Sequence, residues 1–366
     1  MYASTSTGKR TPSRMKKLHK KNKKKWMIRS LIIFFVILIG IGCYIFFTFW
    51  NALGKGYKDA PISQYRSAPV TLDKPFTLLL MGTDNYNSDK KKLNNPEAFG
   101  ERTDVLMLLA VNPEKKQALI VNIPRDTIVP IANTNGVRTK INAAYNYAFG
   151  GLTNKKVDPT QNVLDTVSNF LGGVAIDYYA HINFKGFIDL VNAVGGVDVY
   201  VPYSFHISTF DRVCRFKTGP MHLNGECALP YVRQRHNDPN GDHGRNIRQQ
   251  QVIEKLISKL GSFSSLTDVS GIANAIGDNL SYDIPPSNFL PLASLYKSIP
   301  KKNIEQFQGG VLGGTSANNG VSLGKSDYVV IKASDKQKLY EKLVEMGIPH
   351  GAKPDFVTYK HPSSGK

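Results

Sequence analysis

Runs of apolar residues, separated by short polar stretches, predict three buried strands in the first third of the chain. They cover residues 76–82, 105–111 and 118–123, and each is nearly continuous in Leu, Ile, Val, Met, Phe or Ala. Residues 112–116, Asn-Pro-Glu-Lys-Lys, join the second run to the third and supply the polar turn of a hairpin. The pattern therefore indicates two adjacent antiparallel strands, with the first strand close by.

Apolar positions three and four residues apart predict helices further along the chain. The predicted helices are 162–171, 185–194, 245–260 and 335–346, and the strands between or before them are 177–183, 197–201 and 328–333. Strands that alternate with helices favour an α/β domain with a mixed central sheet flanked by helices in three layers. We expect this domain to cover residues 76–350.

An uncharged apolar run of 21 residues, 30–50, precedes the domain and is long enough to cross a bilayer as one helix. Residues 1–29 contain eleven Lys or Arg residues and no acid, so the positive-inside rule predicts a cytoplasmic head and an uncleaved signal anchor. Residues 51–75 would form a stalk, the domain would lie outside the cell membrane, and 351–366 would be a flexible tail. Binding of the basic head to nucleic acid is the alternative, but no DNA-binding motif accompanies it.

Composition limits the functional classes further. The chain has 366 residues, of which 41% are hydrophobic and 20% charged, and this excludes a wholly disordered or collagen-like protein. Most of the net charge of +19 comes from the head, since 36 basic and 28 acidic residues remain after residue 29. This modest excess suits a phosphate-rich ligand without requiring nucleic acid. Outside the apolar run, Cys214 and Cys227 are either bridged or two free thiols.

Charged residues stand at the ends of the three predicted strands. A hairpin turn centred between residues 114 and 115 would place Asp104 opposite Arg125 and bring Arg102 to the same end. If the first strand runs antiparallel to the second, Asp84 reaches this end as well. Two carboxylates and two guanidinium groups are therefore expected in one site.

The predicted helix at 245–260 begins with a second group of polar residues. Arg245, Arg248 and Gln249 continue the line of Val252 and Leu256, which is the face turned towards the core. Basic side chains at a helix N-terminus oppose the helix dipole unless an anion lies between them. Arginine is suited to binding phosphate oxygens, and carboxylates supply the oxygen ligands that Mg²⁺ prefers. A network of internal Asp–Arg salt bridges without any ligand is the alternative.

Seven ordered motifs between about residues 80 and 253 resemble the LytR-CpsA-Psr family. They are LLLMGTD (78–84), ERTDVLML (101–108), VNIPRDT (121–127), KINAAYNYAFGG (140–151), IDYYAHINFKGFIDLVNAVGGVDVYV (176–201), LNGECALPYVRQRH (223–236) and GDHGRNIRQQQVI (241–253). Thr83, Asn122 and His243 depart from the Ser, Ser and Phe that are more usual in the family, but no charged site residue is lost.

The resemblance implies a membrane-anchored extracytoplasmic phosphotransferase of Gram-positive bacteria. Such an enzyme moves a glycopolymer, for example wall teichoic acid or capsular polysaccharide, from undecaprenyl pyrophosphate to peptidoglycan, and the family fold holds the polyprenyl chain in a hydrophobic tunnel. The motif match assigns Mg²⁺, or Mn²⁺ in its place, to Asp84 and Asp104, and makes these two and Arg125 the catalytic group. It assigns the pyrophosphate to Arg102, Arg125, Arg233, Arg235, Arg245, Arg248 and Gln249.

The charge pattern also permits a mechanism without a Ser or Cys nucleophile. A sugar hydroxyl attacks phosphorus, polyprenyl phosphate leaves, and the site positions the groups and neutralises charge. The residue that accepts the hydroxyl proton is left open between Asp104 and Asp126. A polyprenyl-pyrophosphate phosphatase would use the same residues with water, and a non-catalytic regulator would only sense lipid-linked intermediates, although a 29-residue head is short for a signalling domain.

Overall fold

The computed structural model describes residues 54, 56–58, 65–66, 70–84, 102–209, 212–235, 238–260, 272, 276–312, 314–316 and 328–352. All of them belong to one compact unit, Ala52–Lys366. No helix within these described residues is long and apolar enough to cross a membrane. The predicted anchor at 30–50, and the predicted tail from residue 353 onward, lie outside them.

A six-stranded mixed sheet forms the centre of the domain, in the order β11-β6-β1-β2-β3-β12. The strands are β1 (Phe76–Thr83), β2 (Thr103–Asn112), β3 (Gln117–Asn122), β6 (Tyr178–Asn183), β11 (Leu280–Tyr282) and β12 (Ile304–Val311). β2 is antiparallel to both β1 and β3, β11 is antiparallel to β6, and the pairs β1–β6 and β3–β12 are parallel. The predicted fold class is confirmed.

The register of the central strands agrees with the hairpin predicted from the turn residues. Leu108 lies opposite Val121, and Leu79 of β1 lies opposite Leu108. Continued beyond β3, the alignment of β2 and β3 brings Asp104 to the level of Arg125. The parallel strand β12 beside β3 was not predicted, because nearly 200 residues separate these strands in sequence.

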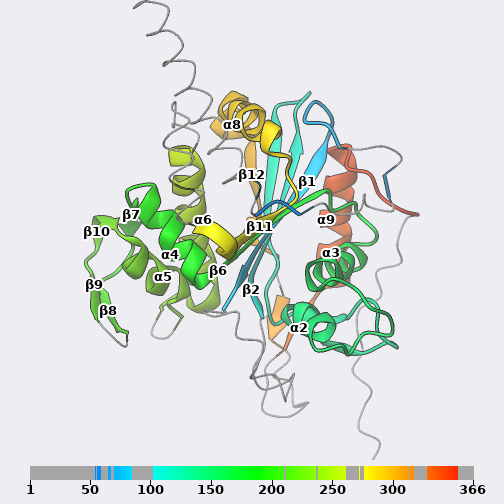
Figure 1. Cartoon of the computed structure of the whole chain (residues 1–366), viewed down its shortest axis with the longest axis horizontal. Coiled ribbons are helices and arrows are strands. Elements are labelled where there is room, and N and C mark those ends of the chain that lie inside the picture. The colour runs from blue at the N-terminus through cyan, green and yellow to red at the C-terminus, as the bar shows by residue number, and fades with distance from the viewer. Residues whose placement is uncertain are drawn as a thin grey trace, which may run out of the picture. The chain divides into compact units, whose positions relative to one another are not determined.

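Helices cover both faces of the sheet (Figure 1). On one side lie α2 (Ala144–Phe149), α3 (Pro159–Phe170) and α9 (Ala333–Glu345), and on the other α4 (Phe184–Ala193), α5 (Gly225–Arg233), α6 (Gly241–Leu260) and α8 (Phe289–Ser298). The helices predicted from periodicity are therefore present. α3 begins where the Asp158 side chain accepts the amides of Thr160 and Gln161, and α6 begins four residues before the predicted start.

Shorter elements complete the domain. Four small two-stranded sheets pair β4 (Ile128–Pro130) with β5 (Arg138–Lys140), β7 (Val197–Val201) with β10 (Gly219–Leu223), β8 (Phe205–Ser208) with β9 (Val213–Phe216), and β13 (Gly314–Ser316) with β14 (Val329–Ile331). 3₁₀ turns occupy Ile141–Ala143, Gly277–Asn279, Pro286–Asn288 and Lys301–Asn303. The last predicted strand is present as β14, but it pairs with β13 instead of joining the central sheet.

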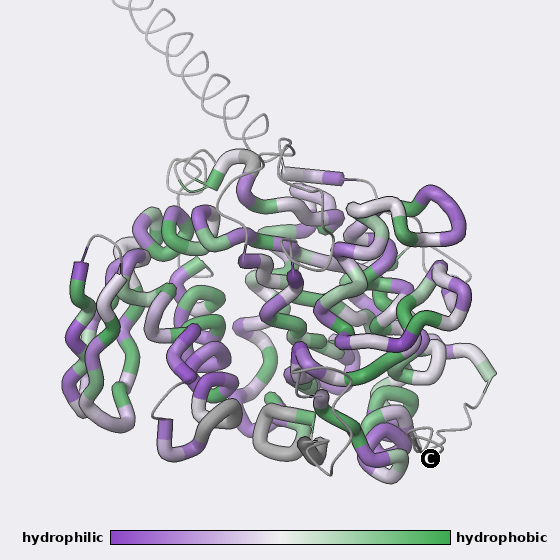
Figure 2. The backbone as a smooth tube through the Cα atoms, turned by 90° about the horizontal axis from the view of Figure 1, so that it is seen from below, coloured by the Kyte–Doolittle hydropathy of each residue, from purple (hydrophilic) through white to green (hydrophobic). Residues whose placement is uncertain are grey.

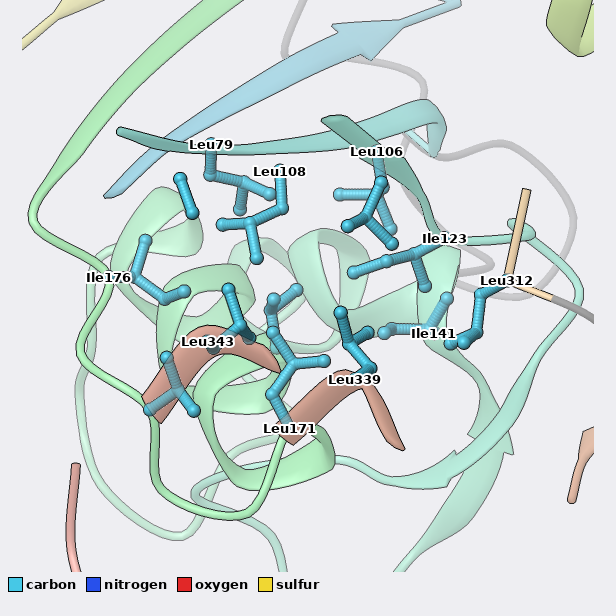
Figure 3. Packing of buried hydrophobic residues seen from close by; sticks show 14 of the residues in the cluster. Leu79, Leu106, Leu108, Ile123, Ile141, Leu171, Ile176, Leu312, Leu339 and Leu343 are labelled. Carbon is cyan, nitrogen blue, oxygen red and sulfur yellow. The ribbon is translucent and has the colours of Figure 1, made fainter. Parts of the chain in front are cut away.

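The two faces of the sheet are sealed to different degrees. On the face towards α3 and α9, Leu79 and Leu108 are fully buried and point towards Leu339 and Leu343 (Figure 3). The hydropathy view likewise shows the apolar strand positions inside and polar positions at the outer turns (Figure 2). On the opposite face of β1, β2 and β6, Phe76, Met107, Val111 and Tyr178 are buried. Other apolar side chains of that face stay partly exposed: Leu78, Leu80, Val105, Leu109, Ala180 and Ile182.

Part of the predicted stalk packs against the domain. Tyr57 forms an isolated β-bridge with Tyr282, and the Lys58 amide donates to the Tyr282 carbonyl over 2.7 Å. Arg66 makes a buried bidentate ion pair with Asp177, which also accepts the Thr77 amide. Where residues 51–75 are described, they are therefore fastened to the sheet and do not form a free tether.

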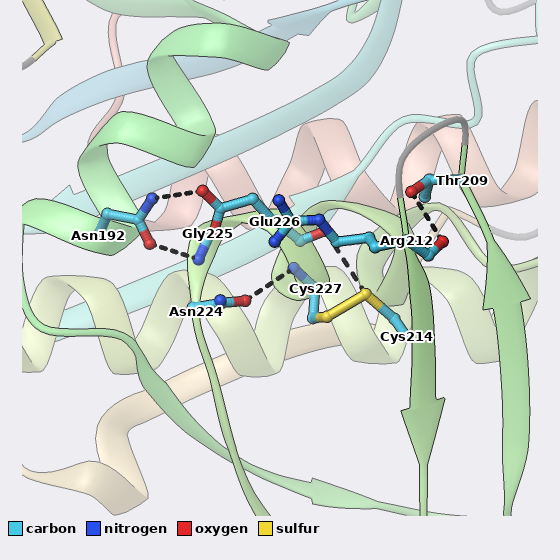
Figure 4. Close-up of a disulfide and its surroundings, with 8 residues drawn as sticks. All are labelled: Asn192, Thr209, Arg212, Cys214, Asn224, Gly225, Glu226 and Cys227. Carbon is cyan, nitrogen blue, oxygen red and sulfur yellow. Dashed lines mark hydrogen bonds between the residues drawn. A yellow bond between two sulfur atoms is a disulfide. The ribbon is translucent and has the colours of Figure 1, made fainter.

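A disulfide joins Cys214 of β9 to Cys227 in the first turn of α5 (Figure 4). It settles the alternative that the sequence left open. The bridge ties the β8–β9 hairpin to the helix whose N-terminus is capped by Asn224, which accepts the Cys227 amide.

Replacing both bridged cysteines with Ser should lower the free energy of unfolding by about 3 kcal/mol, because the short loop would no longer be closed in the unfolded chain. Thermal unfolding of the full chain, with and without reductant, measures this. Cys43→Ser is the matched control and should leave the midpoint unchanged. A wild-type midpoint that reductant does not move would contradict a bridge in the folded protein.

Candidate functional site

The ends of β1, β2 and β3 bring acidic and basic side chains together. Asp84 follows β1, Asp104 is the second residue of β2, and Arg125 lies three residues beyond β3. The Arg125 Nη1 donates to Asp104 Oδ1 over 2.7 Å, and the Arg102 amide donates to Asp84 Oδ1 over 3.2 Å. The structure thus places four of the predicted site residues at one end of the sheet.

The two carboxylates lie close enough to affect each other. Burial raises the pKa of Asp84, and the negative charge of Asp104 raises it further, against the hydrogen bond from the Arg102 amide. A bound cation would relieve this conflict, because it favours the ionised form of both groups. The hydrogen bond from Arg125 uses the Oδ1 atom of the Asp104 carboxylate.

Asp84 and Asp104 are the carboxylates at this end of the sheet that could hold a metal ion. Among the described residues, no group of three or more His, Cys, Asp or Glu side chains could hold a metal ion. Mg²⁺ usually binds through one or two carboxylates, with water and substrate phosphates completing its coordination. Asp84 and Asp104 match that requirement in both number and chemistry.

Asp126 and Lys140 extend the site beyond the residues predicted to bind metal and pyrophosphate. Lys140 Nζ lies 2.9 Å from Asp126 Oδ1, and Arg125 Nε lies 3.5 Å from Asp126 Oδ2. Burial would raise the pKa of Asp126, but the Lys140 hydrogen bond and the charges of Arg125, Lys140 and Arg235 outweigh it and hold the pKa below its ordinary value. Asp126 is therefore a weaker proton acceptor than an ordinary Asp.

Lys140 matches a family motif in the sequence, but no role followed from the residues alone. It belongs to β5, opposite Ile128, so the small β4–β5 sheet directs it back towards the end of β3. Its only sequence signal was its place in the KINAAYNYAFGG motif.

Arg233 and Arg235 lie at and just beyond the end of α5. Both side chains are exposed, and the Arg233 guanidinium lies over the Phe184 ring at 4.4 Å. α5 ends at Arg233, so Arg235 belongs to the segment that leads into α6.

Arg245, Arg248 and Gln249 are buried, with 6%, 2% and 7% exposure, on the α6 face that continues into Val252 and Leu256. The core-facing orientation predicted from their spacing is therefore present. Arg248 donates to the carbonyls of Tyr231 (3.0 Å) and Gln234, and to Asp238 Oδ2 (2.5 Å), while Gln249 Nε2 donates to the Val232 carbonyl over 3.3 Å. Asp238, a residue the sequence did not single out, therefore supplies the negative charge that pairs with buried Arg248.

His181 lies next to the end of β1 and is satisfied by contacts within the chain. Its Nε2 lies 3.0 Å from Thr83 Oγ1, and its ring lies 5.3 Å from that of Tyr145. Burial lowers the pKa of His181 to about 4, so the imidazole is neutral at physiological pH.

Comparison with known proteins finds relatives and solved structures that cover about three quarters of this chain. The chain is 35% identical over 293 residues to the Bacillus subtilis polyisoprenyl-teichoic acid–peptidoglycan teichoic acid transferase TagV, covering 77% of this chain and 70% of TagV. It is 37% identical over 292 residues to the Bacillus anthracis polyisoprenyl-teichoic acid–peptidoglycan teichoic acid transferase TagU, covering 78% of this chain and 88% of TagU. The crystal structure of B. subtilis TagV superposes with a TM-score of 0.60 over 75% of this chain and 98% of that one, at 34% identity. Residues 48–343 match the family model, and the chain belongs to the LytR_cpsA_psr family.

Proposed function

We propose that the protein transfers a glycopolymer from a polyprenyl pyrophosphate carrier to peptidoglycan, and that it does so outside the cell membrane. One observation carries the proposal: basic side chains and the pair Asp84–Asp104 converge at the end of a sheet, next to an apolar sheet face that is not fully covered. An amphipathic donor with a charged head and an isoprenoid tail needs both features. The activity in the names of TagV and TagU supports the same substrate class.

The apolar face supports binding of the isoprenoid tail. Leu78, Leu80 and Leu109 belong to central strands, yet they are partly exposed, whereas Leu79 and Leu108 on the other face are fully buried. A sheet in a folded domain normally buries such residues against another layer. An isoprenoid chain laid along this face would remove their exposed apolar surface from water, at about 25 cal/mol per Å².

The arginines would hold the pyrophosphate, since planar guanidinium groups form paired, charge-assisted bonds to phosphate oxygens. Arg125 is the best supported of the set, because it contacts both Asp104 and Asp126 at the strand ends. Arg102, Arg233 and Arg235 are exposed, and Arg245 lies buried on α6. Arg248 and Gln249 make the backbone contacts described above, and their part is taken up below.

In phosphoryl transfer, the residues of the site mainly position the reacting groups and neutralise the charge on the phosphate oxygens. The acceptor hydroxyl oxygen forms a bond to the polymer-side phosphorus, the bond from that phosphorus to the bridging oxygen breaks, and polyprenyl phosphate leaves with that oxygen. Mg²⁺ bound by Asp84 and Asp104 would supply positive charge to the phosphate oxygens. The low pKa of Asp126 makes it a poor acceptor for the hydroxyl proton.

The apolar run at 30–50 and the basic head before it support anchoring by a single helix, with the N-terminus in the cytoplasm. The Cys214–Cys227 bridge supports an oxidising location for the domain. Both features agree with an acceptor in the cell wall.

Transfer and hydrolysis are separated by one incubation. Purified full-length protein with lipid-linked glycopolymer, peptidoglycan oligomer and Mg²⁺ should yield a covalent glycan–peptidoglycan phosphodiester, detected by mass spectrometry. Release of free glycan phosphate in equal amounts with and without the acceptor would favour the phosphatase. Absence of any product would favour the non-catalytic regulator.

Arg125→Ala should weaken binding of polyprenyl pyrophosphate by about 1.5–3 kcal/mol, the value of a charge-assisted hydrogen bond. Arg125→Lys should recover little, because an ammonium group lacks the planar fork of Arg. Affinity is measured by calorimetry, and Arg215→Ala, at an exposed position on β9, is the control that should bind normally. Normal affinity in a folded Arg125→Ala protein would show that Arg125 only pairs with Asp104.

Asp84→Asn should abolish transfer far more than it reduces carrier binding, because the arginines still attract the anion while the metal acts mainly on charge developing in the transition state. The rate is measured across a Mg²⁺ titration with EDTA controls. Asp198→Asn, at an exposed acid on β7, should leave the titration unchanged. A wild-type rate that EDTA does not affect would exclude the metal.

A further inference from the structure

A buried ion pair joins Arg248 of α6 to Asp238, which lies in the segment between α5 and α6 that also carries Arg235. The side chains are 2% and 1% exposed, and Arg248 Nη1 lies 2.5 Å from Asp238 Oδ2. Arg248 Nε donates to the Tyr231 carbonyl over 3.0 Å, Nη2 donates to the Gln234 carbonyl, and the guanidinium lies 5.8 Å from the Tyr231 ring. All three nitrogens of this guanidinium therefore bind groups of the chain itself.

These bonds fasten both sides of one short segment. Gln234 immediately precedes Arg235, and Asp238 follows it by three residues. Arg248 of α6 thus holds the segment before Arg235 through a carbonyl and after Arg235 through a carboxylate. Asp238 Oδ1 in turn accepts the Asn240 amide over 2.7 Å, which connects the segment to the start of α6.

We propose that Arg248 and Asp238 are positioning residues that fix the segment carrying Arg235, so that its guanidinium meets the donor pyrophosphate. The inference rests on the proposed function, and it replaces direct pyrophosphate binding by Arg248. A buried ion pair gains little net stability over apolar packing. What this pair does impose is geometry, because its bonds hold Gln234 and Asp238, on either side of Arg235, against α6.

Gly244 supplies an independent observation. An ideal Cβ at this position would lie 2.7 Å from Asp238 Cγ and would overlap the carboxylate oxygens. Real Cβ atoms do not approach so closely, and Asp238 is held in place by Arg248. Glycine is therefore required at residue 244 for the Asp238 carboxylate to lie against α6, although Ala would otherwise favour the helix.

A double-mutant cycle tests the proposal, with the full-length chain in detergent and farnesyl pyrophosphate as the probe. Arg248→Met and Asp238→Asn should each weaken binding by up to the effect of Arg235→Ala, between about tenfold and a hundredfold. In the Arg235→Ala background, neither change should weaken binding further, because the residue they position is gone. Arg248→Lys should be intermediate, since it keeps the charge opposite Asp238 and loses the bonds to the carbonyls.

Two further variants separate positioning from general loss of stability. Arg66→Met breaks the equally buried Arg66–Asp177 pair, near the start of β1, and should lower the unfolding midpoint without changing affinity. Gly244→Ala removes no charged group, yet it should weaken binding as Asp238→Asn does, and it should add nothing in an Asp238→Ala background where its clash is absent.

Each outcome is decisive. Losses from Arg248→Met and Arg235→Ala that multiply would show that Arg248 binds the ligand directly, and would overturn the proposal. Normal affinity in Gly244→Ala or in Arg235→Ala would overturn it as well. A wild-type protein that fails to bind farnesyl pyrophosphate would instead contradict the proposed function on which the inference rests, whereas normal wild-type binding with an additive cycle would contradict only the positioning role.

Discussion

The register of three consecutive antiparallel strands is the constraint on which the site depends. Because β2 pairs with β1 on one side and β3 on the other, the residues after β1, at the start of β2 and after β3 must meet at one end of the sheet. A shift of one residue would turn Leu79 and Leu108 out of the sealed core and expose them. Packing of the buried face therefore fixes the strand register, and the register places Asp104 beside Arg125.

The same alternation that seals one face leaves the other incomplete. Some apolar residues on the second face of β1, β2 and β6, such as Leu80 and Leu109, are only partly covered by the chain. The charged end and the apolar face meet on the same strands, so one amphipathic molecule can occupy both. This continuity ties the fold to a lipid-linked phosphate more directly than either feature alone.

How far the sequence predicted this arrangement depended on the range of each interaction. The turn at 112–116 fixed the β2–β3 register and hence the Asp104–Arg125 contact, and the helical spacing of Arg245 and Arg248 predicted that both face the core. Parallel pairing of β12 with β3 could not be predicted, because nothing local in either strand records a partner nearly 200 residues away. Asp238 was missed for a related reason: it lies in an irregular segment, where no period shows which side chain turns inward.

The distribution of counter-charges explains how so many cations remain stable in one domain before any ligand binds. A buried guanidinium without an anion would be strongly unfavourable, so some of the arginines must be compensated internally. Arg248, the most deeply buried, has Asp238, whereas Arg125 shares Asp104 and Asp126 at a half-buried position, and Arg233 and Arg235 are exposed to water. Exposure thus increases from Arg248 through Arg125 to Arg233 and Arg235, so an anion that arrives from solvent meets the outermost guanidinium groups first.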